Sequence, residues 1–138
     1  MPHILLVEDL ANEREMIAAA LEQRGARVTT AKSDKEAYAA LRDASALPFD
    51  ALVTDINLGE GTTGFDVARA ARAIQPSLAV IYMTAYDIEM RQHAAPQSLT
   101  LRKPLKVSEL AADILGHLSS PGVLSRGWDK GEAQASAG

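Results

Sequence analysis

The chain contains no cysteine among its 138 residues, which excludes disulfide bonds, thiolate nucleophiles and thiolate metal ligands. It has no apolar run long enough to cross a bilayer, and its N-terminus lacks the basic stretch and apolar segment of a secretion signal. These absences predict a cytoplasmic protein without membrane contact. Basic residues are outnumbered, 14 against 18 acidic ones, and the net charge of -4 argues against a nucleic-acid-binding surface.

What the chain does contain is a series of short apolar runs separated by segments with helical periodicity. Runs of this kind are typical of parallel strands that are buried on both faces of a sheet. We expect five strands, at residues 3–7, 26–30, 51–55, 78–83 and 99–102. The second is polar enough to be an edge strand. The pattern therefore predicts an α/β domain with a parallel sheet.

Five helices are expected between and after these strands, at residues 11–24, 33–41, 65–74, 87–94 and from about 107 to 118. The first helix carries Met16, Ile17, Ala20 and Leu21 on one stripe. Gly25 follows it, and glycine is common at the position just after a helix. We expect this stripe to face the sheet.

Residues 119–138 shift in composition towards Gly, Ser and Ala. This segment is too short for a second domain and too polar to extend the core. We therefore expect one domain at residues 1–118 and a flexible C-terminal tail at 119–138. The tail holds the single tryptophan, Trp128, which is either an incidental exposed aromatic or an anchor that folds back onto the domain or docks on a partner.

Charged or hydroxyl side chains stand at the ends of four expected strands. Glu8 and Asp9 follow the first strand, Asp55 ends the third, Thr84 follows the fourth and Lys103 follows the fifth. Ligands of open α/β sheets bind beyond the carboxyl ends of the strands, so these residues should converge on one rim. Read singly, the acidic residues could cap a helix, and the lysine could be an ordinary surface residue. Their convergence favours a functional site.

Carboxylates that share a rim repel one another, by roughly 4 kcal/mol for two charges about 4 Å apart at an effective dielectric near 20. Such a cluster either protonates in part or holds a cation. Without cysteine or paired histidines the ligands would be oxygen atoms, which suits Mg²⁺ or Mn²⁺. Lys103 could then balance a phosphoryl group and Thr84 could donate a hydroxyl, while one carboxylate acts as the nucleophile that forms an aspartyl phosphate.

Four segments together resemble the receiver domain of bacterial two-component response regulators, over residues 2–118. They are LLVED at 5–9, LVTDIN at 52–57, YMTA at 82–85 and KP at 103–104. Each segment is a weak signal alone, but all four occur in order at strand ends. The resemblance implies a flavodoxin-like α/β fold, a doubly wound five-stranded parallel sheet in the order 2-1-3-4-5 with five helices.

The resemblance also implies roles for particular residues. Asp55 would accept a phosphoryl group from a phosphohistidine of a sensor histidine kinase or a phosphotransfer protein. Glu8, Asp9 and Asp55 would hold Mg²⁺ together with the backbone carbonyl of Asn57. The chain would be a signalling switch in a phosphorelay rather than an enzyme, and it would act by contact with a downstream protein target.

Two further residues have implied roles at the phosphoryl group. After phosphorylation Thr84 would bond one phosphoryl oxygen and Lys103 would pair with another. The peptide bond between Lys103 and Pro104 is typically cis in this family, and bonds to proline are the usual place for such a bond.

The chain departs from the common receiver pattern at four places. Thr100 stands where a switch tyrosine or phenylalanine is usual, and Gly59 stands where a proline is usual. The segment between Thr84 and the lysine is a few residues short and contains Pro96, so the fourth helix should be short. Tyr86 could take over the switch role. This set resembles a subgroup of single-domain alphaproteobacterial receivers with a Phe-Ala-Thr-Gly-Tyr-type motif.

Three alternatives remain open from the sequence. A phosphohydrolase with an aspartyl-phosphate nucleophile is one, although Asn57 stands where those enzymes carry a second acidic residue. An interaction module that works without phosphorylation is another, because the switch aromatic is missing. A receiver cut from a larger sensor kinase is the third, with residues 119–138 as its linker.

Overall fold

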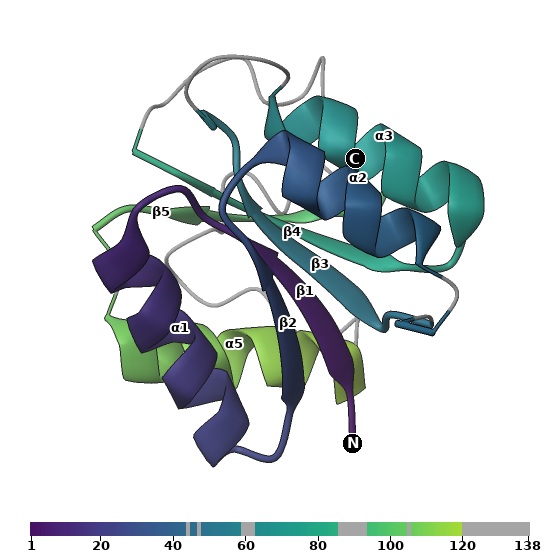
Figure 1. Ribbon diagram of the computed structural model, residues 1–138. Coiled ribbons are helices and arrows are strands. Elements are labelled where there is room, and N and C mark those ends of the chain that lie inside the picture. Colours follow the sequence, from purple (N-terminus) through teal and green to yellow (C-terminus); the bar gives the residue numbers. More distant parts are fainter. Residues whose placement is uncertain (44, 47, 59–62, 86–93, 105, 120–138) are drawn as a thin grey trace.

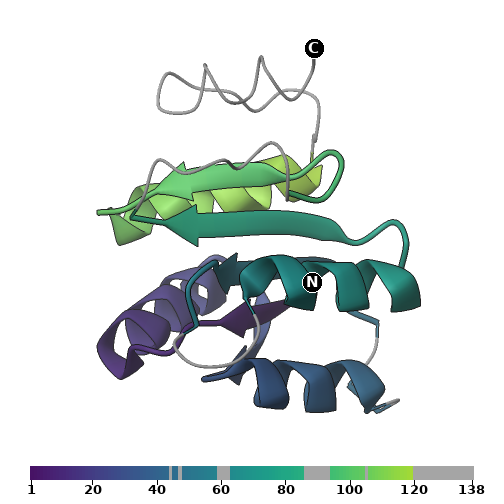
Figure 2. The ribbon, with the colours of Figure 1, turned by 90° about the horizontal axis from the view of Figure 1, so that it is seen from above.

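The computed structural model describes residues 1–43, 45–46, 48–58, 63–85, 94–104 and 106–119 (Figure 1). Five strands form one parallel sheet in the order β2-β1-β3-β4-β5. The strands are β1 (His3–Val7), β2 (Arg27–Ala31), β3 (Ala51–Asp55), β4 (Ala79–Thr84) and β5 (Leu99–Arg102). The predicted flavodoxin-like topology is confirmed, with β2 at one edge and β5 at the other. Figure 2 shows β5 beside β4, both running in the same direction.

Four helices lie within the described residues, namely α1 (Ala11–Gln23), α2 (Asp34–Arg42), α3 (Gly64–Ile74) and α5 (Val107–Ser119). Helices α1 and α5 cover one side of the sheet, and α2 and α3 cover the other (Figure 1). The helix expected at 87–94 falls almost wholly outside the described residues. None of the described helices combines the length and the apolar character that crossing a membrane requires.

Two apolar cores lie on the two faces of the sheet, and alternate strand residues feed them. Leu5 and Leu52 point into the core beneath α2 and α3, whereas Leu6 and Val53 point into the core beneath α1 and α5. Every residue of β1 and β3 is buried, which accounts for the continuous apolar runs of these strands. The central strands are thus packed on both faces, and their carboxyl ends carry the polar residues predicted for the site.

Helix ends follow local sequence signals. Ser33 caps α2 by accepting a hydrogen bond from the backbone N–H of Glu36. Thr63 and Asp66 form a reciprocal capping box at the start of α3. Gly25 follows α1 with a φ of +96°, which glycine adopts without the steric cost that a side chain would carry.

The expectation for Met16 was wrong. Ile17 and Leu21 face the core as predicted, at 2% and 0% exposure, but Met16 is 55% exposed. Successive helix residues are turned by about 100°. Met16 therefore lies at the border of the narrow stripe that α1 buries, and its side chain faces solvent.

The last helix, expected to end at about residue 118, ends at Ser119. The rest of the predicted tail, with Trp128, lies outside the described residues, as does Tyr86.

Candidate functional site

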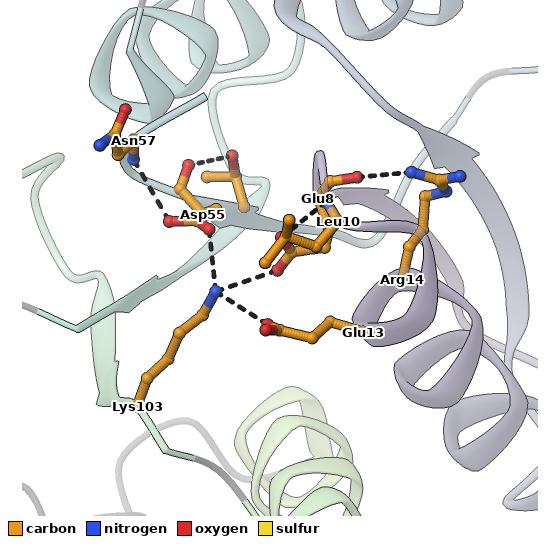
Figure 3. A network of polar contacts seen from close by, with 8 residues as sticks. Glu8, Leu10, Glu13, Arg14, Asp55, Asn57 and Lys103 are labelled. Carbon is orange, nitrogen blue, oxygen red and sulfur yellow. Dashed lines mark hydrogen bonds and ion pairs between the residues drawn. The ribbon is translucent and has the colours of Figure 1, made fainter. Parts of the chain in front are cut away.

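The carboxyl ends of the parallel strands meet at one rim, as the sequence predicts. Glu8 directly follows β1, Asp55 ends β3 and Lys103 directly follows β5 (Figure 3). Glu8 and Lys103 are 95 residues apart in sequence, yet the lysine Nζ donates to Oε1 of Glu8 at 3.2 Å. The fold thus brings these three predicted site residues into direct contact.

Three carboxylates form the acidic part of the site. One oxygen from each of Glu8, Asp9 and Asp55 lies within 4.8 Å of the other two. Glu8 is fully buried, Asp55 is 8% exposed and Asp9 is exposed. The cluster therefore has a buried floor and one side open to solvent.

Lys103 is the cation at the centre of this cluster. Its Nζ donates to Oδ2 of Asp55 at 2.9 Å and also lies 2.9 Å from Oε1 of Glu13 (Figure 3). Burial disfavours the charged amine, but the hydrogen bonds to Asp55 and Glu13 outweigh it and raise the pKa of Lys103. The peptide bond from Lys103 to Pro104 is cis, as expected.

The environment of Glu8 disfavours its charged form. Burial and the neighbouring charge of Asp55 raise the pKa of Glu8 to about 7, against the opposing effects of the Leu10 N–H and of Lys103. The Leu10 N–H donates to Oε2 of Glu8 at 3.2 Å, and Arg14 donates to the Glu8 carbonyl at 2.9 Å. These bonds hold both the backbone and the carboxyl group of Glu8 at the rim, where its side chain is fully buried.

Neither Glu8 nor Asp9, for which helix capping was the structural alternative, is the N-cap residue of α1. The N-cap residue of α1 is Leu10, whose side chain forms no capping hydrogen bond, although its N–H donates to Oε2 of Glu8. Glu8 therefore contacts the start of α1 through Oε2 and the lysine of the rim through Oε1.

Several contacts fix the backbone around Asp55. The Asn57 N–H donates to Oδ1 of Asp55 at 3.2 Å, and the buried hydroxyl of Thr54 donates to the Asp55 carbonyl at 2.8 Å. Gly64, the first residue of α3, donates its N–H to the carbonyl of Ile56 at 2.8 Å. The Oδ2 atom of Asp55 is left to face Lys103.

The remaining predicted residues lie around this centre. Thr84 ends β4 at 2% exposure, and its carbonyl accepts a hydrogen bond from the N–H of Lys103 at 2.7 Å. Asn57 is exposed two residues beyond Asp55. Thr100 lies on β5 directly opposite Tyr82 on β4.

Glu13 is the site residue that sequence reasoning missed. It lies in the first turn of α1, where an acidic residue is common because it complements the helix dipole. Nothing in its sequence neighbourhood distinguishes this ordinary placement from a contact with a lysine that is far away along the chain.

The donor set fits a hard divalent cation. The group of potential ligands consists of oxygen donors only, Glu8, Asp9 and Asp55, and it contains no histidine. Mg²⁺ prefers such oxygen ligands. Burial and, after it, the charge of Asp55 raise the pKa of Glu8, and a cation here would offset both by favouring the charged carboxylate. These three carboxylates are therefore the residues that would hold it.

The chain is similar to known proteins of one family. The response regulator receiver domain family matches the chain over residues 4–115. Response regulator receiver protein CpdR of Brucella abortus is 32% identical over 117 residues, covering 83% of this chain and 94% of that protein. Response regulator SaeR of Staphylococcus aureus is 29% identical, and the match spans 49% of its length.

Solved structures give the same result. A response regulator receiver protein from Sinorhizobium medicae superposes with a TM-score of 0.78 at 29% identity, covering 86% of this chain and 95% of that chain. The non-phosphorylated HemR receiver domain of Leptospira biflexa superposes with a TM-score of 0.71 at 30% identity, covering 91% of this chain and 98% of that chain.

Proposed function

We propose a phosphoacceptor role for Asp55, because the chain belongs to the response regulator receiver domain family. In this proposal a sensor histidine kinase or a phosphotransfer protein presents a phosphohistidine to the rim. A carboxylate oxygen of Asp55 attacks the phosphorus atom, the bond from phosphorus to the histidine nitrogen breaks, and an aspartyl phosphate forms. The reaction takes place in the cytoplasm, and its product is a signalling state rather than a released metabolite.

The contact between Lys103 and Asp55, at 2.9 Å, is the observation that carries the proposal. It places a positive charge next to the carboxylate that would be phosphorylated. After transfer the same amine is within reach of a phosphoryl oxygen, since Lys103 is only 15% exposed and is anchored by the Glu8 carboxylate as well. The buried Thr84 at the neighbouring strand end supplies a hydroxyl for a second phosphoryl oxygen.

Glu8, Asp9 and Asp55, with the backbone carbonyl of Asn57, are the residues proposed to hold Mg²⁺. When bound, the ion supplies positive charge that offsets the charge of the incoming phosphoryl group. Glu8 and Asp9 provide the negative charge that attracts the ion, and the Asn57 N–H orients Asp55 through its bond to Oδ1.

The proposed output is a change in contact with a downstream protein. A phosphoryl group adds about -1.5 to -2 charge at Asp55. Thr84 would move towards the phosphoryl group to bond one of its oxygens. Tyr86, two residues later, is proposed to carry the movement outward in place of the aromatic that Thr100 replaces.

Intact-mass spectrometry after treatment with acetyl phosphate and Mg²⁺ tests the phosphoacceptor role. We expect one added phosphoryl group on the wild type and none on Asp55→Asn or on wild type treated with a chelator. Beryllofluoride, a phosphoryl mimic, should shift NMR signals at the rim even if hydrolysis of the phosphoprotein is fast. Absence of both signals would overturn the proposal. Steady turnover of small phosphate esters would instead indicate a phosphohydrolase.

A further inference from the structure

We propose that Glu13 tunes this site through Lys103, favouring the binding of a divalent cation and opposing the binding of a phosphoryl group at Asp55. The inference rests on the proposed function, because it concerns the same rim. Glu13 would act as a positioning residue on Lys103 and would touch neither the cation nor the phosphoryl group.

The geometry of Lys103 supports this role. An ammonium group has three N–H donors, and Nζ of Lys103 has three carboxylate partners, at 2.9 Å for Asp55, 2.9 Å for Glu13 and 3.2 Å for Glu8. Figure 3 shows Glu13 reaching Lys103 from α1, while Asp55 contacts it from the end of β3. Glu13 thus occupies one of the three donors that the amine can offer.

Glu13 differs from the other two partners of Lys103 in how exposed its side chain is. The side chain of Glu13 is 43% exposed, against 11% for Asp55 and none for Glu8. Glu8 and Asp55 belong to the group of potential cation ligands, whereas Glu13 does not. Glu13 can therefore be replaced without removing a proposed ligand or a buried charge.

Charge balance gives the direction of the effect. Lys103 faces three carboxylates, and Asp9 adds a fourth to the rim. The Glu13 charge attracts a cation and repels an anion. Its hydrogen bond also draws the Lys103 amine away from a phosphoryl oxygen. Loss of that charge should therefore weaken cation binding and strengthen phosphoryl binding, by about two- to fivefold each, the size expected of a partly exposed ion pair.

The expected effects on cation binding and on phosphoryl binding are opposite in sign, and this distinguishes the proposed role of Glu13 from a merely structural one. If Glu13 only stabilised the N-terminal turn of α1, its replacement would loosen the whole rim, and the cation and the phosphoryl group would both bind more weakly. Glu15 provides the matched control. It lies on α1, is exposed, and has no ion pair or side-chain hydrogen bond among the described residues.

The test compares Glu13→Gln with Glu15→Gln and with wild type in three measurements. In metal-free protein, peptide mapping after acetic anhydride treatment reports how fast Lys103 is acylated. Calorimetry gives the dissociation constant of Mg²⁺. NMR titration at saturating Mg²⁺ gives the dissociation constant of beryllofluoride. For Glu13→Gln we expect faster acylation, weaker Mg²⁺ binding and tighter beryllofluoride binding, while Glu15→Gln matches wild type.

Each other result would overturn the inference. Unchanged acylation would mean that Glu13 does not hold Lys103. Equal weakening of both ligands would assign Glu13 a structural role, and unchanged constants would assign it none. Failure of the proposed function looks different, because wild type itself would then bind no beryllofluoride. In that case the inference about phosphoryl binding would be wrong as well, and the acylation rate of Lys103 would show whether Glu13 restrains this lysine.

Discussion

Gly64 packs so closely against Asp55 that any Cβ at position 64 would overlap the Asp55 carbonyl oxygen. The same added atom would lie 3.0 Å from the Cα atom of Ile56. The carbonyl of Asp55 also accepts the hydrogen bond from the hydroxyl of Thr54. Gly64 at the start of α3 and the Thr54 hydroxyl on β3 therefore both contact the carbonyl of the proposed phosphoacceptor, Asp55.

Replacing Gly64 by alanine should destabilise the protein by about 1–3 kcal/mol, because the overlap involves backbone atoms that cannot rotate away. It should also slow phosphorylation by acetyl phosphate, since the Asp55 peptide must move. Urea unfolding and the rate of mass increase measure the two effects.

Gly116→Ala in α5 is the matched control, because a Cβ there meets nothing within 4 Å. It should stabilise the protein by about 0.5–1 kcal/mol through helix propensity. Equal effects of the two substitutions would show that the approach of Gly64 to Asp55 has no energetic consequence.

Lys103→Gln should destabilise the metal-free protein by about 3 kcal/mol, because it leaves the buried carboxylates of Glu8 and Asp55 without their cation. Added Mg²⁺ should recover much of this loss. Lys32→Gln is the control, since Lys32 pairs with Glu36 at 3.9 Å on the surface and should change stability by less than about 0.5 kcal/mol. Urea unfolding with and without Mg²⁺ tests both. A Lys103→Gln protein as stable as wild type without metal would contradict the account of the acidic cluster.

Tyr82→Phe should lower stability by about 1–3 kcal/mol. The hydroxyl of the fully buried Tyr82 accepts a hydrogen bond from the N–H of Ala95 at 3.0 Å, and phenylalanine would leave that N–H without its partner. The edge-on ring contact with Phe65 would be kept, so packing changes little. Hydrogen exchange at the Ala95 amide should become faster. Unchanged exchange would mean that this bond does not secure the segment before β5.

His117 should make stability depend on pH. Its Nδ1 atom is buried without a hydrogen-bond partner among the described residues, and burial lowers the pKa of His117 below the usual 6.5. The unfolded chain then takes up a proton at a higher pH than the folded one, so stability falls as pH drops through about 6.5. His117→Gln removes this contribution. Glu8, whose raised pKa acts in the opposite direction over this pH range, is common to both proteins. When the pH falls from 7.5 to 5.5, the unfolding free energy of the variant should therefore rise relative to that of wild type, and an unchanged gap between the two proteins would contradict the assignment.

The sequence predicted the sheet well because its central strands are buried on both faces. Short, continuous apolar runs such as those around Leu5 and Leu52 are typical of strands in a covered parallel sheet, and polar residues at their ends mark the rim. Met16 was misplaced because a helical stripe inferred from sequence has no defined border. Glu13 was missed because its contact with Lys103 depends on how closely the first turn of α1 approaches the residue that follows β5, which no local pattern encodes.

Reduction with borohydride is the measurement that tests the central claim most directly. The reagent converts an aspartyl phosphate to homoserine, so it marks the residue that carries the phosphoryl group. After treatment with acetyl phosphate and Mg²⁺, peptide mass spectrometry should find homoserine at position 55 alone, and none without acetyl phosphate. Homoserine at Asp9 instead, or at no position in protein that has gained a phosphoryl group, would contradict the role given to Asp55.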